Sequence, residues 1–355
     1  MVREKNIKII FGHIKNYNYL YKMGGNALKT ETFRKTTDEF NKIASEIIPI
    51  IESGLNTETF IAKCYHNKET HGDMDILIKM DSNNQGINLI DFINNTFKPN
   101  DLYNNNGVVS FDYDEFQIDF IPIKISNWEI AKVWYSYDPF SNLAGKSSHR
   151  FGTKYGHGGL VYPFRNFNGR LSKDITLSKD PKRIFEFLGY DYERFQKGFD
   201  NLEEIFEYVI DGKYFDYSIF LMENLNHIDR KRNKKRKSYQ EFLQYIENKG
   251  IKSTYQFSKD KSTYIDLIHD SFPKVDLKGK IEELSKKDAE NSELNEKFNG
   301  RLIMDIFPEL TGKELGNIIT NFQKSFGDYR EFALKHSTDD IMFQFGKFYQ
   351  KEKGS

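Results

Sequence analysis

The sequence predicts a mixed α/β (α+β) core with a small mixed sheet, followed by a mostly α-helical C-terminal region. Short runs rich in β-branched and aromatic residues occur between residues 57 and 123, separated by one helix-like stretch. From about residue 181 onward, the apolar residues recur almost everywhere at helical spacing. With 355 residues, of which 38% are hydrophobic, the chain is long enough to form two domains with buried cores.

The first predicted element is a helix within residues 28–53, in which Phe40, Ile43, Ile47 and Ile51 share one face. Gly54 is its predicted stop. We expect residues 1–54 to form an N-terminal helical segment that packs on the core.

The core is predicted over residues 55–190, with an uncertainty of about ten residues at its C-terminal boundary. Residues 191–355 are then a helical C-terminal domain that binds the acceptor. The predicted core contains a helix at residues 86–97 and strands at residues 57–63, 74–80, 107–113, 116–123 and around Gly159–Phe164.

Composition limits the class of protein. The 52 basic and 52 acidic side chains cancel, so a nucleic-acid site would have to be a local basic patch. A single cysteine excludes an internal disulfide framework, and no apolar run approaches the roughly 18 residues that cross a bilayer. We therefore expect a cytoplasmic protein without a membrane partner.

The stretch His71–Lys79, HGDMDILIK, places Asp73 and Asp75 at the start of an apolar strand. Residues i and i+2 of a strand lie on one side, so both carboxylates can point to the same place. Two carboxylates alone would repel each other, whereas a hard divalent cation such as Mg²⁺ removes the repulsion. Asp119, in the later strand-like run FQIDFIPI, is the candidate third acid of a two-metal site.

These residues resemble the catalytic segment of the DNA polymerase beta nucleotidyltransferase superfamily, in which Gly-Ser is followed about ten residues later by Asp-x-Asp in a strand. The closest likeness is to family X polymerases, because Lys68, Glu69, Thr70, His71 and Gly72 stand before the motif. The resemblance implies that Asp73, Asp75 and Asp119 bind Mg²⁺ or Mn²⁺ and that Asp119 activates the acceptor 3′-hydroxyl. It also implies a nucleoside triphosphate as substrate, with Gly72 among the residues that bind it.

Two further segments extend the likeness over roughly residues 55 to 195. VWYSYDPFSNLAGKSSHRFGTKYG (133–156) is similar to the family X segment whose aromatic turn cups the incoming sugar, which makes Tyr135 a candidate nucleotide-binding residue. DPKRIFEFLGYDYERF (180–195) is similar to the element in which a helix ends in Leu-Gly and a Tyr.

One position departs from the pattern. Ala62-Lys63 stands where the superfamily has Gly-Ser, with Ala62 eleven residues before Asp73. Lys63 is a candidate nucleotide-binding residue that would pair with a phosphate as a point charge. The alternative is that the site has changed or lost its substrate. Gly24-Gly25 lies 48 residues before Asp73, with the predicted helix between, and is interpreted as a turn.

Two basic groups are candidates for phosphate contacts. Lys146 and Arg150, about one helical turn apart, would reach nucleotide phosphates, or else lie on a solvated helix end. The run RKRNKKRK would bind a nucleic-acid backbone if it lined the cleft, or else form a solvated connection. Its basic residues are Arg230, Lys231, Arg232, Lys234, Lys235, Arg236 and Lys237.

Near the C-terminus, FPELTGKELGNIITNFQKSF resembles a Gly-x-x-Leu-Gly element of tRNA nucleotidyltransferases and poly(A) polymerases; alternatively, Gly312 and Gly316 merely allow a tight turn and close packing. Together these likenesses favour template-independent extension of an RNA 3′ end, of the poly(A) or CCA type. A family X gap-filling DNA polymerase, nucleotide transfer to a protein or small molecule, and an inactive nucleotidyltransferase-like scaffold are the alternatives.

Overall fold

The computed structural model describes residues 25, 27–80 and 87–354, and the contacts between them define two units. The first unit comprises the described residues up to Pro163 together with Ile175–Val275. The second comprises Phe164–Asp174 and the chain from Asp276 onward. The contacts thus group residues 191–275 with the unit that holds the sheet, whereas the sequence predicts a boundary near residue 190. Whether residues 191–355 act as one acceptor-binding domain stays a prediction.

Helix α2 spans Thr37–Leu55 and begins nine residues later than the start of the predicted range. Thr36 caps it, since its side chain accepts from the Glu39 N–H while the Glu39 carboxylate accepts from the Thr36 N–H. Ala27 and Phe33, which precede Thr36, instead make hydrogen bonds with other parts of the first unit.

The predicted stop of this helix at Gly54 is wrong. The helix continues through Leu55 and ends at Asn56, which adopts the left-handed conformation with φ 48°. A Cβ at Gly54 would lie 2.5 Å from the Phe92 ring, so this glycine serves close packing rather than termination.

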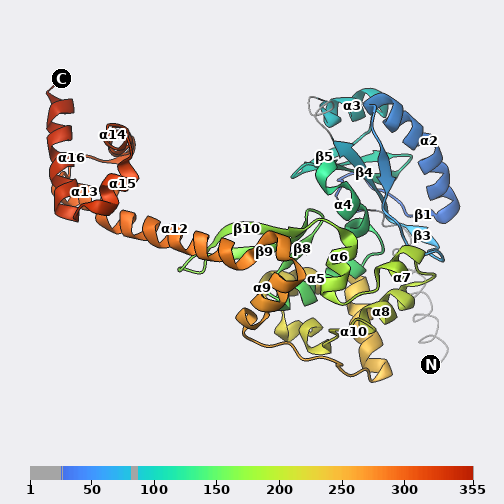
Figure 1. The fold of residues 1–355 in the computed structure, drawn as a ribbon. Coiled ribbons are helices and arrows are strands. Elements are labelled where there is room, and N and C mark those ends of the chain that lie inside the picture. The colour runs from blue at the N-terminus through green and yellow to red at the C-terminus, as the bar shows by residue number, and fades with distance from the viewer. Residues whose placement is uncertain (1–24, 26, 81–86, 355) are drawn as a thin grey trace, which may run out of the picture. The chain divides into compact units, whose positions relative to one another are not determined.

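The central sheet has five strands in the order β2-β4-β7-β6-β5 (Figure 1). Strand β4 pairs in parallel with β7, and the other pairs are antiparallel. The predicted strands at 57–63, 74–80, 107–113 and 116–123 are confirmed with shifted ends, whereas β5 was not predicted. The bounds are β2 Thr59–Ile61, β4 Asp73–Met80, β5 Leu102–Asn105, β6 Val108–Tyr113 and β7 Phe116–Lys124.

The two faces of this sheet are covered by different helices. Ile43, Ile47 and Ile51 of α2 pack with Ile76 and Phe120 into one core, which α3 (Leu89–Thr96) also joins through its buried side chain. The predicted helix at residues 86–97 is confirmed over this span, and residue 86 lies outside the described residues. On the opposite face, α4 (Trp128–Tyr135) packs on the C-terminal halves of β4 and β7.

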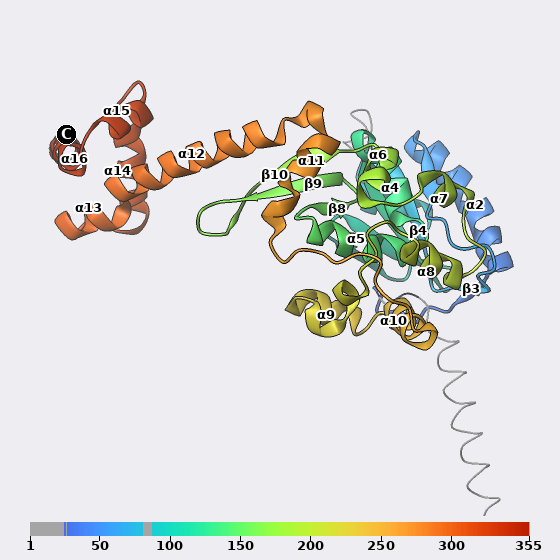
Figure 2. The same ribbon diagram turned by 60° about the horizontal axis from the view of Figure 1, so that its bottom comes forward.

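A layer of short helices completes the first unit and includes α5 (Phe140–Arg150), which lies alongside β8 (Lys154–Gly156) (Figure 2). The prediction that the chain is almost wholly helical from about residue 181 is confirmed for the described residues. The remaining helices of this unit are α6 Pro181–Leu188, α7 Tyr192–Lys197, α8 Leu202–Ile210, α9 His227–Asn233, α10 Lys237–Lys249, α11 Ile265–Ser271 and the 3₁₀ turns η1 Ile125–Asn127, η2 Tyr217–Phe220, η3 Met222–Asn224, η4 Lys261–Tyr264 and η5 Pro273–Val275.

Two smaller sheets accompany the central one. Strand β1 (Lys35–Thr36) pairs with β3 (Thr70–His71). The other sheet has the order β10-β9-β8, with β9 at Gly159–Arg165 and β10 at Leu171–Ser178. The predicted strand around Gly159–Phe164 is therefore confirmed, whereas β10 was not predicted.

The second unit is a helical bundle with an aromatic core. Phe298, Phe322 and Phe345 pack against one another with ring centroids 5.2 to 5.4 Å apart. Its helices are α12 Leu277–Lys297, α13 Gly300–Ile306, α14 Gly312–Lys324, α15 Tyr329–Lys335 and α16 Thr338–Lys353. Among the described residues, no helix has both the length and the apolar character that crossing a membrane requires.

The packing of α2 on the sheet can be tested with a matched pair of substitutions. Ile47→Ala should lower the free energy of unfolding by about 2–5 kcal/mol, because Ile47 is fully buried and its loss leaves a cavity. Ile50→Ala, on the same helix at a position 43% exposed, should cost about 0.5 kcal/mol or less. Urea denaturation measures both, and equal losses would contradict this packing.

Candidate active site

The candidate site is built on the parallel pairing of β4 with β7. In the register of this pair, Asp75 lies opposite Asp119 and Asp73 lies opposite Gln117. Because side chains alternate along a strand, these four residues share one face, the one that α4 covers further along the strands. The fold therefore brings the three predicted carboxylates together at one end of this face.

Protein groups hold Asp119 in place. Gln117 Nε2 donates to both of its carboxylate oxygens, at 3.0 and 3.1 Å. Ser110, which lies opposite Asp119 in β6, adds a further side-chain hydrogen bond. For Asp73 and Asp75, the described part of the chain provides no side-chain hydrogen bond or ion pair. The site thus combines one fixed carboxylate with two that lack such partners.

Burial and mutual repulsion disfavour charge on these carboxylates. Burial is the largest cause that raises the pKa of Asp75, to about 8, and the charges of Asp73 and Asp119 add to it. Burial also raises the pKa of Asp119 to about 6, although its hydrogen bonds oppose the shift. Asp73 is exposed, yet the protein around its carboxylate removes enough water to raise its pKa as well.

Two cationic side chains lie near Asp73. The charges of Lys68 and Arg34 both lower its pKa and so partly offset the effect of burial. Arg34 is held by Thr70, whose hydroxyl and carbonyl oxygens accept from the guanidinium at 3.0 and 2.8 Å. Lys68 Nζ lies 3.3 Å from the Cys64 sulfur.

The donor set suits a hard divalent cation, because three carboxylates on one face are unfavourable until a cation neutralises them. The three are not assembled as a cage, however. Among residues 25, 27–80 and 87–354, no group of three or more His, Cys, Asp or Glu side chains converges as a metal site. Mg²⁺ ordinarily takes one or two carboxylates plus phosphates and water, so the residues fit a cation whose remaining ligands are water or phosphate oxygens.

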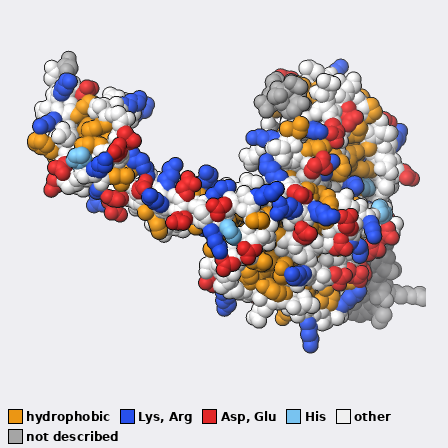
Figure 3. Space-filling view, viewed as in Figure 1, with side chains coloured by type: hydrophobic (Ala, Val, Ile, Leu, Met, Phe, Trp, Pro, Cys, Tyr) orange, Lys and Arg blue, Asp and Glu red, His pale blue; other side chains and the backbone are white. Residues whose placement is uncertain are grey.

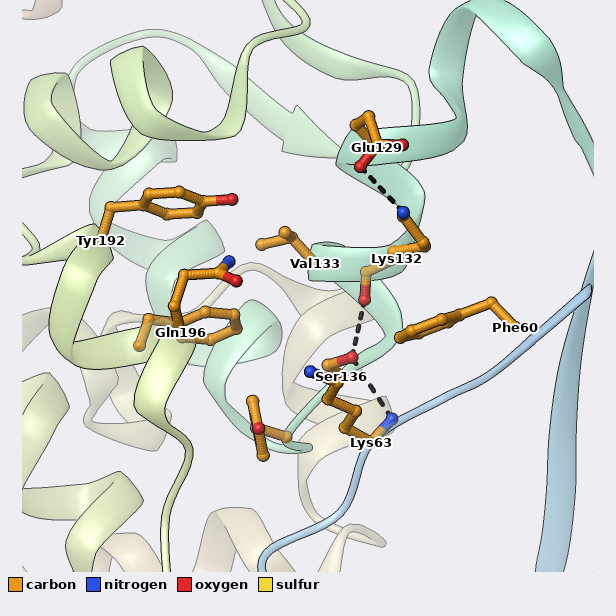
Figure 4. A pocket seen from close by; sticks show the side chains of 10 residues that line it. Phe60, Lys63, Glu129, Lys132, Val133, Ser136, Tyr192 and Gln196 are labelled. Atoms are coloured by element: carbon orange, nitrogen blue, oxygen red, sulfur yellow. Dashed lines mark hydrogen bonds and ion pairs between the residues drawn. The ribbon is translucent and has the colours of Figure 1, made fainter.

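Ala62-Lys63 lies beside Asp75, because the Ala62 N–H donates to the Asp75 carbonyl at 3.0 Å. The Lys63 N–H donates to Ser136 Oγ at 3.3 Å, and the Lys63 carbonyl accepts from the Tyr137 N–H at 2.7 Å. Figure 4 shows Lys63 and Ser136 at the edge of a small pocket of about 120 Å³. The turn that contains Ser136 and Tyr137 is thereby bonded directly to the main chain of Lys63.

A second pocket, of about 460 Å³, also borders Lys63. Lys63, Lys68 and Lys197 line it, and none of its described lining residues is acidic. His71, also in its lining, stacks on Phe40 at 4.1 Å. Burial lowers the pKa of His71 to about 4, so this ring is neutral at pH 7. The lysines make the pocket suitable for an anion.

Two of the remaining predicted nucleotide-binding residues adjoin the carboxylates. Gly72 lies between β3 and β4, next to Asp73. Tyr135 lies near Asp75, whose charge adds to the effect of burial in raising the pKa of the Tyr135 hydroxyl. Its ring centroid is 6.1 Å from that of His157.

Lys146 has a different environment from the one predicted. Its side chain is 7% exposed and pairs with Asp229 at 2.9 Å, so a phosphate contact would require this buried ion pair to break. Arg150, in the last turn of α5, is half-buried, and its Nη2 lies 3.5 Å from the Asn224 carbonyl. The signal that predicted them, helical spacing of two cations, carries no information about tertiary partners.

The basic segment, Arg230–Lys237, includes the end of α9 and the first residue of α10. All of its basic residues are exposed except Arg236, which is half-buried. The next residue, Ser238, donates to Asp138 Oδ2 at 3.3 Å. On the face shown in Figure 3, Lys and Arg are interspersed with Asp and Glu, and no positively charged patch extends over this face.

Two residues of this site were not predicted. Asp138 directly follows Tyr137, and its charge contributes to the raised pKa of both Asp73 and Asp75. Gln117 contacts Asp119 directly. Strand alternation in FQIDFIPI could have indicated Gln117, because it precedes Asp119 by two residues, whereas no local pattern marks Asp138.

No protein-family model matches this chain, and no curated protein matches it. The resemblance to the nucleotidyltransferase superfamily therefore depends on the motif residues and on their arrangement alone.

The raised pKa values predict a pH dependence of stability for the metal-free protein. When the pKa of a carboxylate is higher in the folded protein than in the unfolded chain, its protonated form stabilises the fold. This contribution to the free energy of unfolding is complete at low pH and is lost as pH rises through the folded-state pKa. Between pH 5 and 8 the melting temperature should therefore fall, since Asp119 and Asp75 titrate at about 6 and about 8.

Asp75→Asn removes one of these charges and should raise stability at pH 8 by roughly 1–2 kcal/mol while flattening the pH profile. Thermal unfolding in the presence of a chelator measures the effect. Asp91→Asn, at an exposed position on α3, is the control and should leave the profile unchanged. An Asp75→Asn profile that parallels the wild type would contradict the assignment.

Proposed function

We propose that this protein is a Mg²⁺-dependent nucleotidyltransferase, which transfers a nucleoside monophosphate from a nucleoside triphosphate to a nucleic-acid 3′-hydroxyl and releases pyrophosphate. The observation that carries the proposal is the parallel register that puts Asp73, Asp75 and Asp119 on one face. Asp73, Asp75 and Asp119 would hold the divalent cation. Bound there, Mg²⁺ or Mn²⁺ would supply charge neutralisation of the triphosphate and a lower pKa for the attacking hydroxyl.

The fixed carboxylate suits the role of proton acceptor. A pKa of about 6 leaves Asp119 largely ionised at neutral pH and still able to take a proton. The 3′-hydroxyl oxygen attacks the α-phosphorus, its proton passes to Asp119, and the bond from the α-phosphorus to the bridging oxygen of pyrophosphate breaks. Hydrogen bonds from Gln117 and Ser110 keep the carboxylate oxygens of Asp119 in position.

The pocket lined by Lys63, Lys68 and Lys197 supports binding of a triphosphate. Its lysines offer mobile point charges in place of the backbone and hydroxyl donors of a Gly-Ser pair. Lys68 belongs both to this pocket and to the surroundings of Asp73, which connects the anion pocket with the carboxylates.

The acceptor would bind along the basic segment. Its C-terminal neighbour Ser238 contacts Asp138, and Asp138 is one of the charges that act on Asp73 and Asp75. An exposed cationic segment whose neighbour contacts Asp138 supports a polyanionic acceptor. We favour RNA, with template-independent addition of the poly(A) or CCA type, over a gapped DNA duplex.

An inactive scaffold is the competing function from another class. Ala62-Lys63 in place of Gly-Ser favours it, as does the lack of a converged three-acid group among the described residues. The scaffold would bind nucleic acid or another partner, and only the first hypothesis predicts extension.

The decisive assay incubates the protein with Mg²⁺ or Mn²⁺, each ribo- or deoxynucleoside triphosphate, and end-labelled RNA, single-stranded DNA or gapped DNA. We expect ribonucleotide addition to RNA, with a loss of at least about 10³-fold in Asp75→Asn, because that site would lose a cation ligand. Asp91→Asn should retain wild-type activity.

Other outcomes discriminate among the alternatives. Deoxynucleotide addition limited to gaps would instead identify a repair polymerase. Absence of extension on every acceptor, together with nucleic-acid binding that Asp75→Asn does not change, would support the scaffold.

The basic segment is tested separately. The double variant Lys234→Gln/Lys235→Gln should weaken RNA binding about equally for all sequences and reduce the slope of log affinity against log salt by up to about 2. Fluorescence anisotropy at several salt concentrations measures both. The double variant Lys42→Gln/Lys124→Gln, at exposed positions outside the segment, is the charge-matched control, and an equal loss there would indicate only a general charge effect.

A further inference from the structure

Gln117 is buried between the Asp119 carboxylate and the N-terminal segment, which we define as Gly25 and Ala27–Thr36. It is 2% exposed. Its Oε1 accepts from the Ala27 N–H at 3.0 Å, and its Nε2 donates to both oxygens of Asp119. Each end of the amide therefore has a defined partner.

These partners fix the orientation of the amide. The Ala27 N–H can only donate, so it must face the amide oxygen, and the amide nitrogen must then face Asp119. A reversed amide would put an oxygen against a carboxylate and a donor against a donor. Because the amide is neutral, it holds Asp119 in place without neutralising its charge.

The glycine at residue 25 is required for this arrangement. A Cβ there would lie 2.3 Å from both Cδ and Oε1 of Gln117. Any other residue would therefore displace the Gln117 side chain or the segment itself. Gly24 lies outside the described residues. The interpretation of this pair as a simple turn leaves out the contact of Gly25 with the candidate site.

The N-terminal segment is anchored to the sheet near this point. The N–H groups of Lys29 and Thr30 donate to Asp101 Oδ2, at 2.6 and 3.1 Å. The Phe33 N–H donates to the Glu115 carbonyl at 2.8 Å. These contacts give the main chain at Gly25 and Ala27 a fixed position from which to hold Gln117.

We propose that Gln117 is a positioning residue that orients Asp119, and that the main chain of Gly25 and Ala27 holds Gln117 in turn. The main chain of the N-terminal segment thereby belongs to the active site, in addition to the Arg34 side chain, whose charge acts on Asp73. This inference rests on the proposed function. Loss of a partner that orients a metal ligand typically costs 10–100-fold in metal affinity or activity.

The test uses the full-length protein with Gln117→Leu, Gly25→Ala and the double variant. Mn²⁺ binding to the metal-free protein is measured by titration calorimetry without nucleotide, and kcat and KM for the triphosphate are measured on the acceptor that the wild type extends. Each single variant should lose about 10–100-fold in Mn²⁺ affinity and in kcat, with KM for the triphosphate little changed. If Gly25 acts through Gln117, the double variant should be no worse than Gln117→Leu.

Gly327→Ala is the matched control, since a Cβ at Gly327 would meet nothing within 4 Å, and it should behave as the wild type. The inference would be overturned if Gln117→Leu kept the wild-type Mn²⁺ affinity and kcat. It would also be overturned if the losses of affinity and kcat followed the melting temperature of the variant and recovered on cooling. Additive losses in the double variant would overturn the role of Gly25. A wild type that neither binds Mn²⁺ nor extends any acceptor would overturn the proposed function, and this inference with it.

Discussion

The parallel pairing of β4 with β7 is the constraint on which the candidate site depends. Asp73 and Asp75 come from one strand and Asp119 from another, 44 residues after Asp75 in the sequence. A register shifted by one residue would move a carboxylate to the α2 face, into the core formed by residues such as Ile76 and Phe120. The apolar residues that fix the register therefore also fix the position of the charges.

This arrangement has an electrostatic cost that the surrounding residues reduce only in part. Lys68 and Arg34 act on Asp73, and Gln117 with Ser110 acts on Asp119. Burial and neighbouring carboxylates still raise the pKa of Asp75 to about 8. A purely structural face would not gather carboxylates in this way, because apolar residues there would be more stable. The unfavourable gathering of negative charge is thus itself an argument that this face of the sheet binds a ligand.

Local patterns predicted α2 and four strands of the central sheet, because the alternation of a strand and the buried stripe of a helix depend on residues close together in the sequence. They failed where distant residues decide the outcome. Gly54 was misread as a helix stop because its packing against Phe92 depends on another element. The ion pair of Lys146 could not be predicted because its partner, Asp229, lies 83 residues further along the chain, and a phosphate contact of Lys146 stays a prediction. Asp138 was missed for the same reason.

The three carboxylates are not equivalent, and the difference follows from their neighbours. Asp119 sits between the polar side chains of Ser110 and Gln117, whose hydrogen bonds define its position without any ligand. Asp73 and Asp75 have no such donors within the described residues, so their positions depend on whatever neutralises them. In a nucleotidyltransferase this asymmetry would suit the roles of the three carboxylates. A proton acceptor must be aligned before the reaction, whereas carboxylates that bind a cation and its triphosphate can take their final positions when these ligands bind.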